Sequence, residues 1–197
     1  LTGANNVATI NRADYTAING TKTYDGAATF SSGQVTLTGV NAETFNVAAT
    51  ADSANASLNA GATKFVSAGA VTGGGNYNAL TVTSLTGANN VATINRANYS
   101  SITGAKTYDA TTNFTTAQVA LAGVAGQTFT VASATSDFAN ASTNLVTPAQ
   151  KFVATGAISG VAGADPNNYS LNFGTIATNT ATINAANYSS ITGAKTY

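Results

Sequence analysis

The chain has 197 residues, of which seven are Lys or Arg and seven are Asp or Glu, and it contains no His, Cys, Met or Trp. Because the net charge is zero, no electrostatic attraction draws the chain to nucleic acid, and nucleic-acid binding is excluded as a function. The lack of Cys excludes disulfides and thiolate metal sites, and no apolar run approaches the roughly 20 residues that cross a bilayer, so we expect no membrane insertion in this segment.

Small and hydroxylated residues dominate the rest of the composition. Ala, Thr, Asn, Ser and Gly in such amounts are typical either of a disordered low-complexity segment or of a stalk built from many small β domains. Disordered segments combine low hydrophobicity with high net charge, whereas 44% of this chain is hydrophobic. The composition therefore favours folded β domains.

Short strand-like segments follow one another along the chain, separated by turn residues. In chain order they cover 7–10, 34–38, 44–48, 64–71 and 79–83. Apolar residues alternate within them, as in Val35 and Leu37, which is the period-2 pattern of half-buried strands. Only 51–60 and 137–144 are expected to form a short helical turn. The predicted fold class is all-β, with an Ig-like β-sandwich as the first choice and a β-grasp-like α+β domain with one short helix as the alternative.

The chain also repeats itself. The decapeptide LTGANNVATI begins at Leu1 and again at Leu85, and a block ending in Lys-Thr-Tyr begins at Tyr15, Tyr99 and Tyr188, so its copies are 84 and 89 residues apart. A solenoid coil has a period of roughly 20 to 50 residues, whereas this period fits one small domain per repeat. The sequence therefore predicts a piece of a tandem array.

Domain boundaries are placed at the start of the repeated block. This choice makes 12–95 the first repeat and 96–184 the second, with 1–11 as the last strand of a preceding repeat and 185–197 as the first strand of a following one. No Pro-rich or Gly-rich linker separates the repeats. We therefore expect neighbouring repeats of the same chain to be each other's main partners.

Four motifs occur in the same order in both repeats. The first repeat has Lys-Thr-Tyr-Asp-Gly from Lys22, Leu-Thr-Gly-Val from Leu37, Gly-Asn-Tyr from Gly75 and Ala-Thr-Ile from Ala92; the second has the counterparts from Lys106, Leu121, Asn168 and Ala181. This order resembles the YDG repeat family of large filamentous-haemagglutinin-like bacterial adhesins. The resemblance implies tandem extracellular spacer domains, often exported by two-partner secretion, without enzymatic activity. Ala110 replaces the family's Gly, which indicates that this turn tolerates a Cβ.

Comparing the repeats tests the candidates for catalysis, because a site present in each repeat requires its residues to recur. The carboxylates and guanidinium groups do not recur: Asp14 becomes Asn98, Glu43 becomes Gln127, and Arg12 and Arg96 become Ala185. His and Cys are absent, so Ser and Thr lack the usual activating base. We predict no catalytic residue, no cofactor and no enzymatic activity.

One charged cluster does recur, and we interpret it as a structural repeat motif. Its residues are Lys22, Tyr24 and Asp25 in the first repeat and Lys106, Tyr108 and Asp109 in the second. On a strand the Lys and Tyr share a face, and the Asp opens a turn through an Asx-type bond. The alternatives are a ligand site and a Lys-to-Asn isopeptide crosslink assisted by the Asp.

Metal binding and aromatic recognition are both disfavoured. Calcium needs six to eight oxygens with several carboxylates close together, whereas the Asp residues here are dispersed singly, so no metal site is predicted. Six aromatic residues recur in register and are expected in the core: Phe45, Phe65, Tyr77, Phe129, Phe152 and Tyr169. The Asn-x-Ser/Thr sequons are attributed to composition rather than to glycosylation.

These observations predict a structural stalk of an extracellular bacterial surface adhesin or filament, of the kind found in biofilms. Lateral or end-to-end self-association through unpaired edge strands is expected, and the adhesive ligand is not specified by the sequence. The alternative function is a glycan- or polysaccharide-binding repeat module. An ice-binding surface is disfavoured because no short regular Thr period is present.

Overall fold

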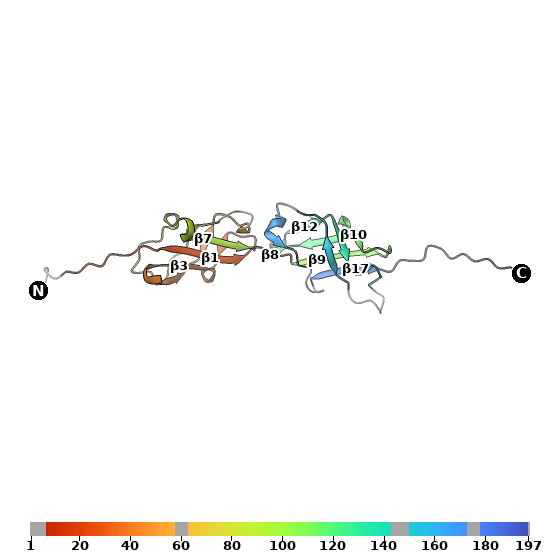
Figure 1. Ribbon diagram of the computed structural model, residues 1–197, viewed down its shortest axis with the longest axis horizontal. Coiled ribbons are helices and arrows are strands. Elements are labelled where there is room, and N and C mark those ends of the chain that lie inside the picture. The colour runs from red at the N-terminus through yellow and green to blue at the C-terminus, as the bar shows by residue number, and fades with distance from the viewer. Residues whose placement is uncertain (1–6, 58–62, 143–149, 173–177, 197) are drawn as a thin grey trace. The chain divides into compact units, whose positions relative to one another are not determined.

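A computed structural model describes residues 7–57, 63–142, 150–172 and 178–196. The chain divides into two compact units, Leu1–Ala97 and Asn98–Tyr197, and each is described by itself. Figure 1 shows the strands of both units. Strands in several sheets dominate the described residues, which hold no helix of seven residues or more, so the predicted all-β class is confirmed.

The first unit contains two sheets. Its mixed sheet has the order β4-β3-β1-β7, and its antiparallel sheet has the order β2-β5-β6. The strands are β1 (Ala17–Thr23), β2 (Thr29–Phe30), β3 (Val35–Thr38), β4 (Thr44–Asn46), β5 (Ala49–Ala51), β6 (Phe65–Ala68) and β7 (Asn90–Asn95). Single 3-10 turns are η2 (Ser32–Gln34), η3 (Val40–Ala42), η4 (Val82–Ser84) and η5 (Gly87–Asn89).

The second unit repeats this plan and adds the strand β15 and the short pair β8 and β16. Its larger sheet has the order β15-β12-β11-β9-β17 and its smaller sheet the order β10-β13-β14. The strands are β8 (Ala97–Asn98), which pairs with β16 (Tyr169–Ser170), and β9 (Ser101–Thr107), β10 (Asn113–Thr115), β11 (Val119–Ala122), β12 (Thr128–Val131), β13 (Ser133–Ser136), β14 (Phe152–Thr155), β15 (Ile158–Gly160) and β17 (Asn179–Asn184). The 3-10 turns are η6 (Thr116–Gln118), η7 (Val124–Gly126) and η8 (Pro166–Asn168).

The first and last long strands of each unit lie side by side and run in the same direction. β1 pairs in parallel with β7 from Ile18 opposite Asn90 to Thr23 opposite Asn95, while its other edge pairs antiparallel with β3. β9 pairs with β17 and β11 in the same way. A parallel pair needs a long connection, and here nearly the whole unit supplies it.

The two sheets of a unit meet at a glycine. The ring of Phe65 on β6 reaches β1 so closely that a Cβ on Gly20 would lie 2.8 Å from its Cζ atom. In the second unit a Cβ on Gly104 would lie 2.7 Å from Cζ of Phe152. Both rings are at most 1% exposed, so the core sits between the sheets, and Gly is needed here for close approach.

A tight turn joins the second and third strands of the larger sheet. The Glu43 N–H donates to the Val40 carbonyl, and the two residues between them, Asn41 and Ala42, have φ values of 51° and 60°. Two consecutive positive φ angles define the type I′ turn that suits a twisted hairpin. This turn accounts for the Leu-x-Gly-Val motif, which runs into it in both units.

One of the five expected strands is wrong. Residues 7–10 are exposed and not paired with any described strand, and their place as the last strand of a preceding repeat stays a prediction. Residues 79–83 contain no strand, and η4 begins at Val82 instead, where it packs against β6. The expected segments 34–38, 44–48 and 64–71 contain β3, β4 and β6, each shorter than expected.

Of the two expected helical turns, the first has its described residue Ser57 in a helical conformation, and the second is not found within the described residues. β5 extends to Ala51, and 58–60 lie outside the described residues. In the other segment 137–142 form no helix, and 143–144 lie outside the described part. Within the described ranges, none of the helices has the length and apolar character to cross a membrane.

Candidate functional site

The recurring lysine lies at the inner face of β1, where its ammonium group is enclosed. Its side chain is 1% exposed, and Nζ donates to Oδ1 of Asp25 at 2.6 Å and to the carbonyls of Ala27 and Thr29 at 2.7 and 2.9 Å. The ammonium also lies 5.1 Å from the ring centroid of Phe30. Three acceptors and a ring face thus satisfy the buried charge, and they fasten the end of β1 to the following turn.

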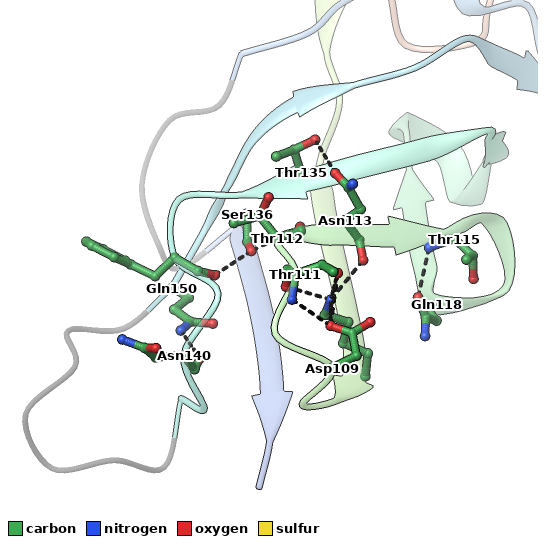
Figure 2. Close-up of polar contacts among 12 residues, drawn as sticks. Asp109, Thr111, Thr112, Asn113, Thr115, Gln118, Thr135, Ser136, Asn140 and Gln150 are labelled. Carbon is green, nitrogen blue, oxygen red and sulfur yellow. Dashed lines mark hydrogen bonds and ion pairs between the residues drawn. The ribbon is translucent and has the colours of Figure 1, made fainter. Parts of the chain in front are cut away.

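The second unit builds the same enclosure and adds a hydroxyl. Lys106 donates to Asp109 at 2.6 Å, to the carbonyls of Thr111 and Asn113, and to Oγ1 of Thr111 at 2.9 Å. Figure 2 shows Asp109 beside Thr111, which donates both its N–H and its hydroxyl to the carboxylate. The expected Asx-type turn at the Asp is therefore present in both units.

These contacts keep both carboxylates ionised. Burial raises the pKa of Asp25, but hydrogen bonds from Lys22 and the Ala27 N–H outweigh it, so the pKa lies below its usual value. For Asp109 the hydrogen bond from Lys106 and those from Thr111 lower the pKa to about 2. A carboxylate held in this form accepts hydrogen bonds and does not supply a proton at neutral pH.

The tyrosines of the motif differ between the units. Tyr24 is 5% exposed and lies on the buried side with Lys22, as predicted from strand alternation. Tyr108 is 42% exposed. A recognition site used in every repeat would need the same presentation twice, and this ring is presented in only one of them.

The lysine enclosure does not have the arrangement of an isopeptide site. The Lys22 ammonium donates to Asp25 and to two backbone carbonyls, and the Asp25 side chain is 54% exposed. An ammonium that donates three hydrogen bonds has no free electron pair to attack an amide. The geometry supports the structural interpretation of this cluster.

A second cluster is aromatic and lies at the start of each unit's first long strand. Tyr15 stacks on Tyr77 with ring centroids 4.6 Å apart, and Phe45 meets both rings edge-on. Tyr99, Tyr169 and Phe129 repeat the arrangement. Five of the six aromatic residues expected in the core are buried, as predicted, while Phe45 is half-buried.

The hydroxyl of the inner tyrosine closes the type I′ turn. Tyr77 Oη accepts the Val40 N–H at 2.9 Å and donates to Glu43, and it lies so near Gly39 that a Cβ there would be 2.2 Å away. In the second unit Tyr169 accepts from Val124 and donates to Oε1 of Gln127 at 2.6 Å. Glu43 and Gln127 therefore perform the same structural task, which explains why the charge is dispensable.

The same environment suppresses ionisation of these phenols. The hydrogen bond to Glu43 and burial raise the pKa of Tyr77. Burial, followed by the neighbouring Tyr169 and Asp165, raises the pKa of Tyr99 to about 12. Neither phenol acts as a base near neutral pH, and both serve to pack the cluster.

Sequence reasoning missed a buried asparagine that bridges two strands. Asn90 is 5% exposed; its Oδ1 accepts the Phe65 N–H at 2.8 Å and its Nδ2 donates to the Phe65 carbonyl at 3.0 Å. Asn179 bonds to both backbone groups of Phe152 at 2.8 Å. The signal was present, because an Asn stands two residues before Ala-Thr-Ile in both repeats.

The outer edge of the last strand is also covered. Ala92 donates its N–H to the Thr63 carbonyl and accepts from the Thr63 hydroxyl, and the Ile94 N–H donates to Oγ of Ser57 at 2.8 Å. In the second unit Gln150 and Ser142 take the places of Thr63 and Ser57. This edge is therefore closed to an incoming strand.

The described residues contain few groups that could form a metal, ligand or glycosylation site. No group of three or more Asp or Glu side chains that could hold a metal ion occurs among them. A groove of about 510 Å³ in the first unit is lined by apolar and polar residues of β6, of β7 and of the segment from Thr83 to Ala88, with Lys64 among them. The sequon residue Asn168 is 1% exposed, so it does not present its amide for glycosylation in the folded unit.

Comparison with protein-family models, with curated proteins and with solved structures finds no match to this chain. The function is therefore inferred from the geometry of the two units and from the residues that recur in both.

Proposed function

We propose that the chain is a pair of structural stalk repeats from a secreted bacterial surface adhesin or extracellular filament. One observation carries the proposal: the polar and aromatic clusters that recur in both units bond to the backbone of their own unit. The lysine enclosure ties β1 to its turn, the tyrosine hydroxyl closes the hairpin, and the asparagine bridges β6 and β7. The residues that recur in both repeats are those that hold each domain together, as expected where selection acts on the length of the array.

The proposal includes the family and the finer fold. The motif order supports YDG-type repeats at the bacterial cell surface, each built as a small sandwich of two sheets. Immunoglobulin-type sandwiches consist of antiparallel sheets. The parallel pairing of β1 with β7 departs from that pattern, so the proposed domain is an all-β sandwich in which the larger sheet is mixed.

Fewer sheet edges are open for self-association than the sequence indicated. The β7 and β17 edges are covered, and β15 covers the edge of β12 in the second unit. In the first unit β4 has no described strand on its outer edge, but it is three residues long. Short edge strands resist pairing with other chains, so lateral contacts between fibres are better sought on the sheet faces.

The test is replacement of the repeats within the protein that carries them. If length is the function, deleting both units lowers adhesion of intact cells, and inserting an unrelated rigid spacer of similar length restores it. Antibody against this chain should label the surface of intact cells. Failure of the unrelated spacer to restore adhesion, with normal surface display, would contradict the proposal.

The glycan-binding alternative makes a different prediction. It requires an exposed aromatic or polar cluster in both units, whereas the recurring rings are largely buried and the exposed Tyr108 has a buried counterpart in Tyr24. A glycan array probed with this chain distinguishes the two functions. Binding that is lost on Tyr108→Ala would favour recognition over spacing.

A further inference from the structure

Each unit receives and releases the chain at opposite ends of one strand pair. The chain enters the first unit ahead of Ala17 and leaves after Asn95, at the start of β1 and the end of β7. Because β1 and β7 are parallel and in register from Ile18 opposite Asn90 to Thr23 opposite Asn95, these two points lie at opposite ends of the pair. β9 and β17 place the entry and exit of the second unit in the same way.

This geometry decides how tension along the chain acts on the hydrogen bonds. Pulling the entry and exit apart slides β1 along β7, so the force lies along the strands and the whole row of bonds between them shares the load. Had the two strands been antiparallel neighbours, entry and exit would lie at one end, and the bonds would break one after another. Inter-strand bonds lie across the strand direction, so the first arrangement loads them all together.

The last strand is held on both of its edges. The N–H groups of Ala92 and Ile94 point outward to Thr63 and Ser57, so by strand alternation the N–H groups of Val91, Thr93 and Asn95 face β1. The Tyr24 N–H extends the inner row by donating to the Asn95 carbonyl at 2.8 Å. Sliding β7 therefore breaks an inner row of bonds together with outer ones.

The first strand is prevented from sliding by two further contacts. The Phe65 ring occupies the space above Gly20, between side chains of β1 that would have to pass it. At the far end of β1 the buried Lys22 ammonium is bonded to the backbone carbonyls of Ala27 in the following turn and of Thr29 at the start of β2. Gly104 with Phe152 and Lys106 with its carbonyls repeat both contacts.

We propose that the parallel pairs β1/β7 and β9/β17 are force-bearing clamps that keep each repeat folded when the array is under tension. The biological use of the clamp rests on the proposed stalk function, since only a stalk between two attachment points carries such a load. The mechanical property itself belongs to each unit and is measurable without that context.

Single-molecule force spectroscopy on the whole chain tests the clamp, and the absence of native Cys makes attachment through engineered Cys unambiguous. The pair Asn11→Cys with Arg96→Cys loads β1 against β7 along the strands. The matched pair Thr23→Cys with Arg96→Cys pulls at the same end of both strands and peels the same bonds open. All three positions are exposed, so we expect both double variants to fold, which circular dichroism verifies.

We expect the lengthwise pair to unfold at a force at least twofold higher than the peeling pair at equal loading rate. Asn95→Cys with Ala185→Cys, against Thr107→Cys with Ala185→Cys, should repeat the difference in the second unit. Equal forces in the two geometries would overturn the clamp, whatever the function of the array. A clear difference in unfolding force between the two geometries would retain the clamp. If the full protein also joins these repeats to a catalytic domain, the stalk function would be overturned while the clamp stands.

Discussion

Removal of the asparagine bridge gives the sharpest test of what holds a unit together. Asn90→Ala deletes both side-chain partners of the Phe65 backbone, the acceptor at 2.8 Å and the donor at 3.0 Å. Alanine cannot replace either bond, and Phe65 is 1% exposed, so water cannot reach its backbone groups without opening the core. The substitution therefore leaves two buried polar groups without partners.

The expected cost follows from those two groups. A buried backbone group that loses its partner costs about 1 to 3 kcal/mol, so we expect the loss of both partners in Asn90→Ala to lower the free energy of unfolding of the first unit by about 2 to 6 kcal/mol. A domain of this size is stable by roughly 4 to 13 kcal/mol. The substitution thus removes a large share of the stability, and the midpoint temperature should fall by on the order of 10 °C or more.

Hydrogen exchange measured by NMR resolves the effect within a single sample. The Phe65 amide should lose protection in Asn90→Ala, while the Phe152 amide, bonded to Asn179, should keep it. Asn19→Ala on β1 is the matched control because Asn19 is exposed, and we expect it to change stability by less than about 0.5 kcal/mol. Equal effects of Asn90→Ala and Asn19→Ala would refute the reasoning.

Three further predictions concern single residues in the two units. Ala110 has a φ of 60° where Gly26 has 85°, so Ala110→Gly should stabilise its unit by about 1 kcal/mol and Gly26→Ala should destabilise the other by a similar amount, as urea unfolding would measure; effects of the same sign would contradict this. Gly104→Ala would place a Cβ 2.6 Å from the Gln118 carbonyl oxygen and should cost about 1 to 3 kcal/mol, whereas Gly33→Ala meets open space and should cost nothing in the same assay. The pKa of Asp109, lowered from 3.8 to about 2, contributes stability that is complete above the unfolded pKa and is lost as the pH falls through the folded one. The urea concentration at the unfolding midpoint of the second unit should therefore fall as the pH is lowered from about 4 to about 2, and Asp109→Asn should flatten this dependence. An unchanged pH dependence in Asp109→Asn would show that the carboxylate is not responsible.

Several features of the site could be predicted from local patterns. Strand alternation placed Lys22 and Tyr24 on one face, which the structure buries, and the recurrence of Phe65 and Phe152 marked them as core. Both inferences depend only on residues two apart or on equivalent positions in the repeats, and the pleat of a strand enforces the first of them.

Other features depend on residues far apart in the sequence. The decapeptide at Leu1 is identical to the one at Leu85, yet 7–10 form no strand while Asn90–Asn95 form β7. The expected strand at 79–83 is absent, and η4 begins at Val82 instead. An apolar alternating segment becomes a strand only where a sheet edge is open to it, and no local pattern reports which edges are already occupied.

The sequence by itself determined the repeat, the all-β class and most of the core, because these follow from composition, period-2 alternation and comparison of two copies. Only the tertiary structure decided that β1 and β7 run in parallel, since their pairing joins residues about seventy positions apart. It also decided that Asn90 and the lysine ammonium bond to the backbone of their own unit. The partners of a buried polar side chain are set by which strands the fold brings beside it, and the residue type alone does not specify them.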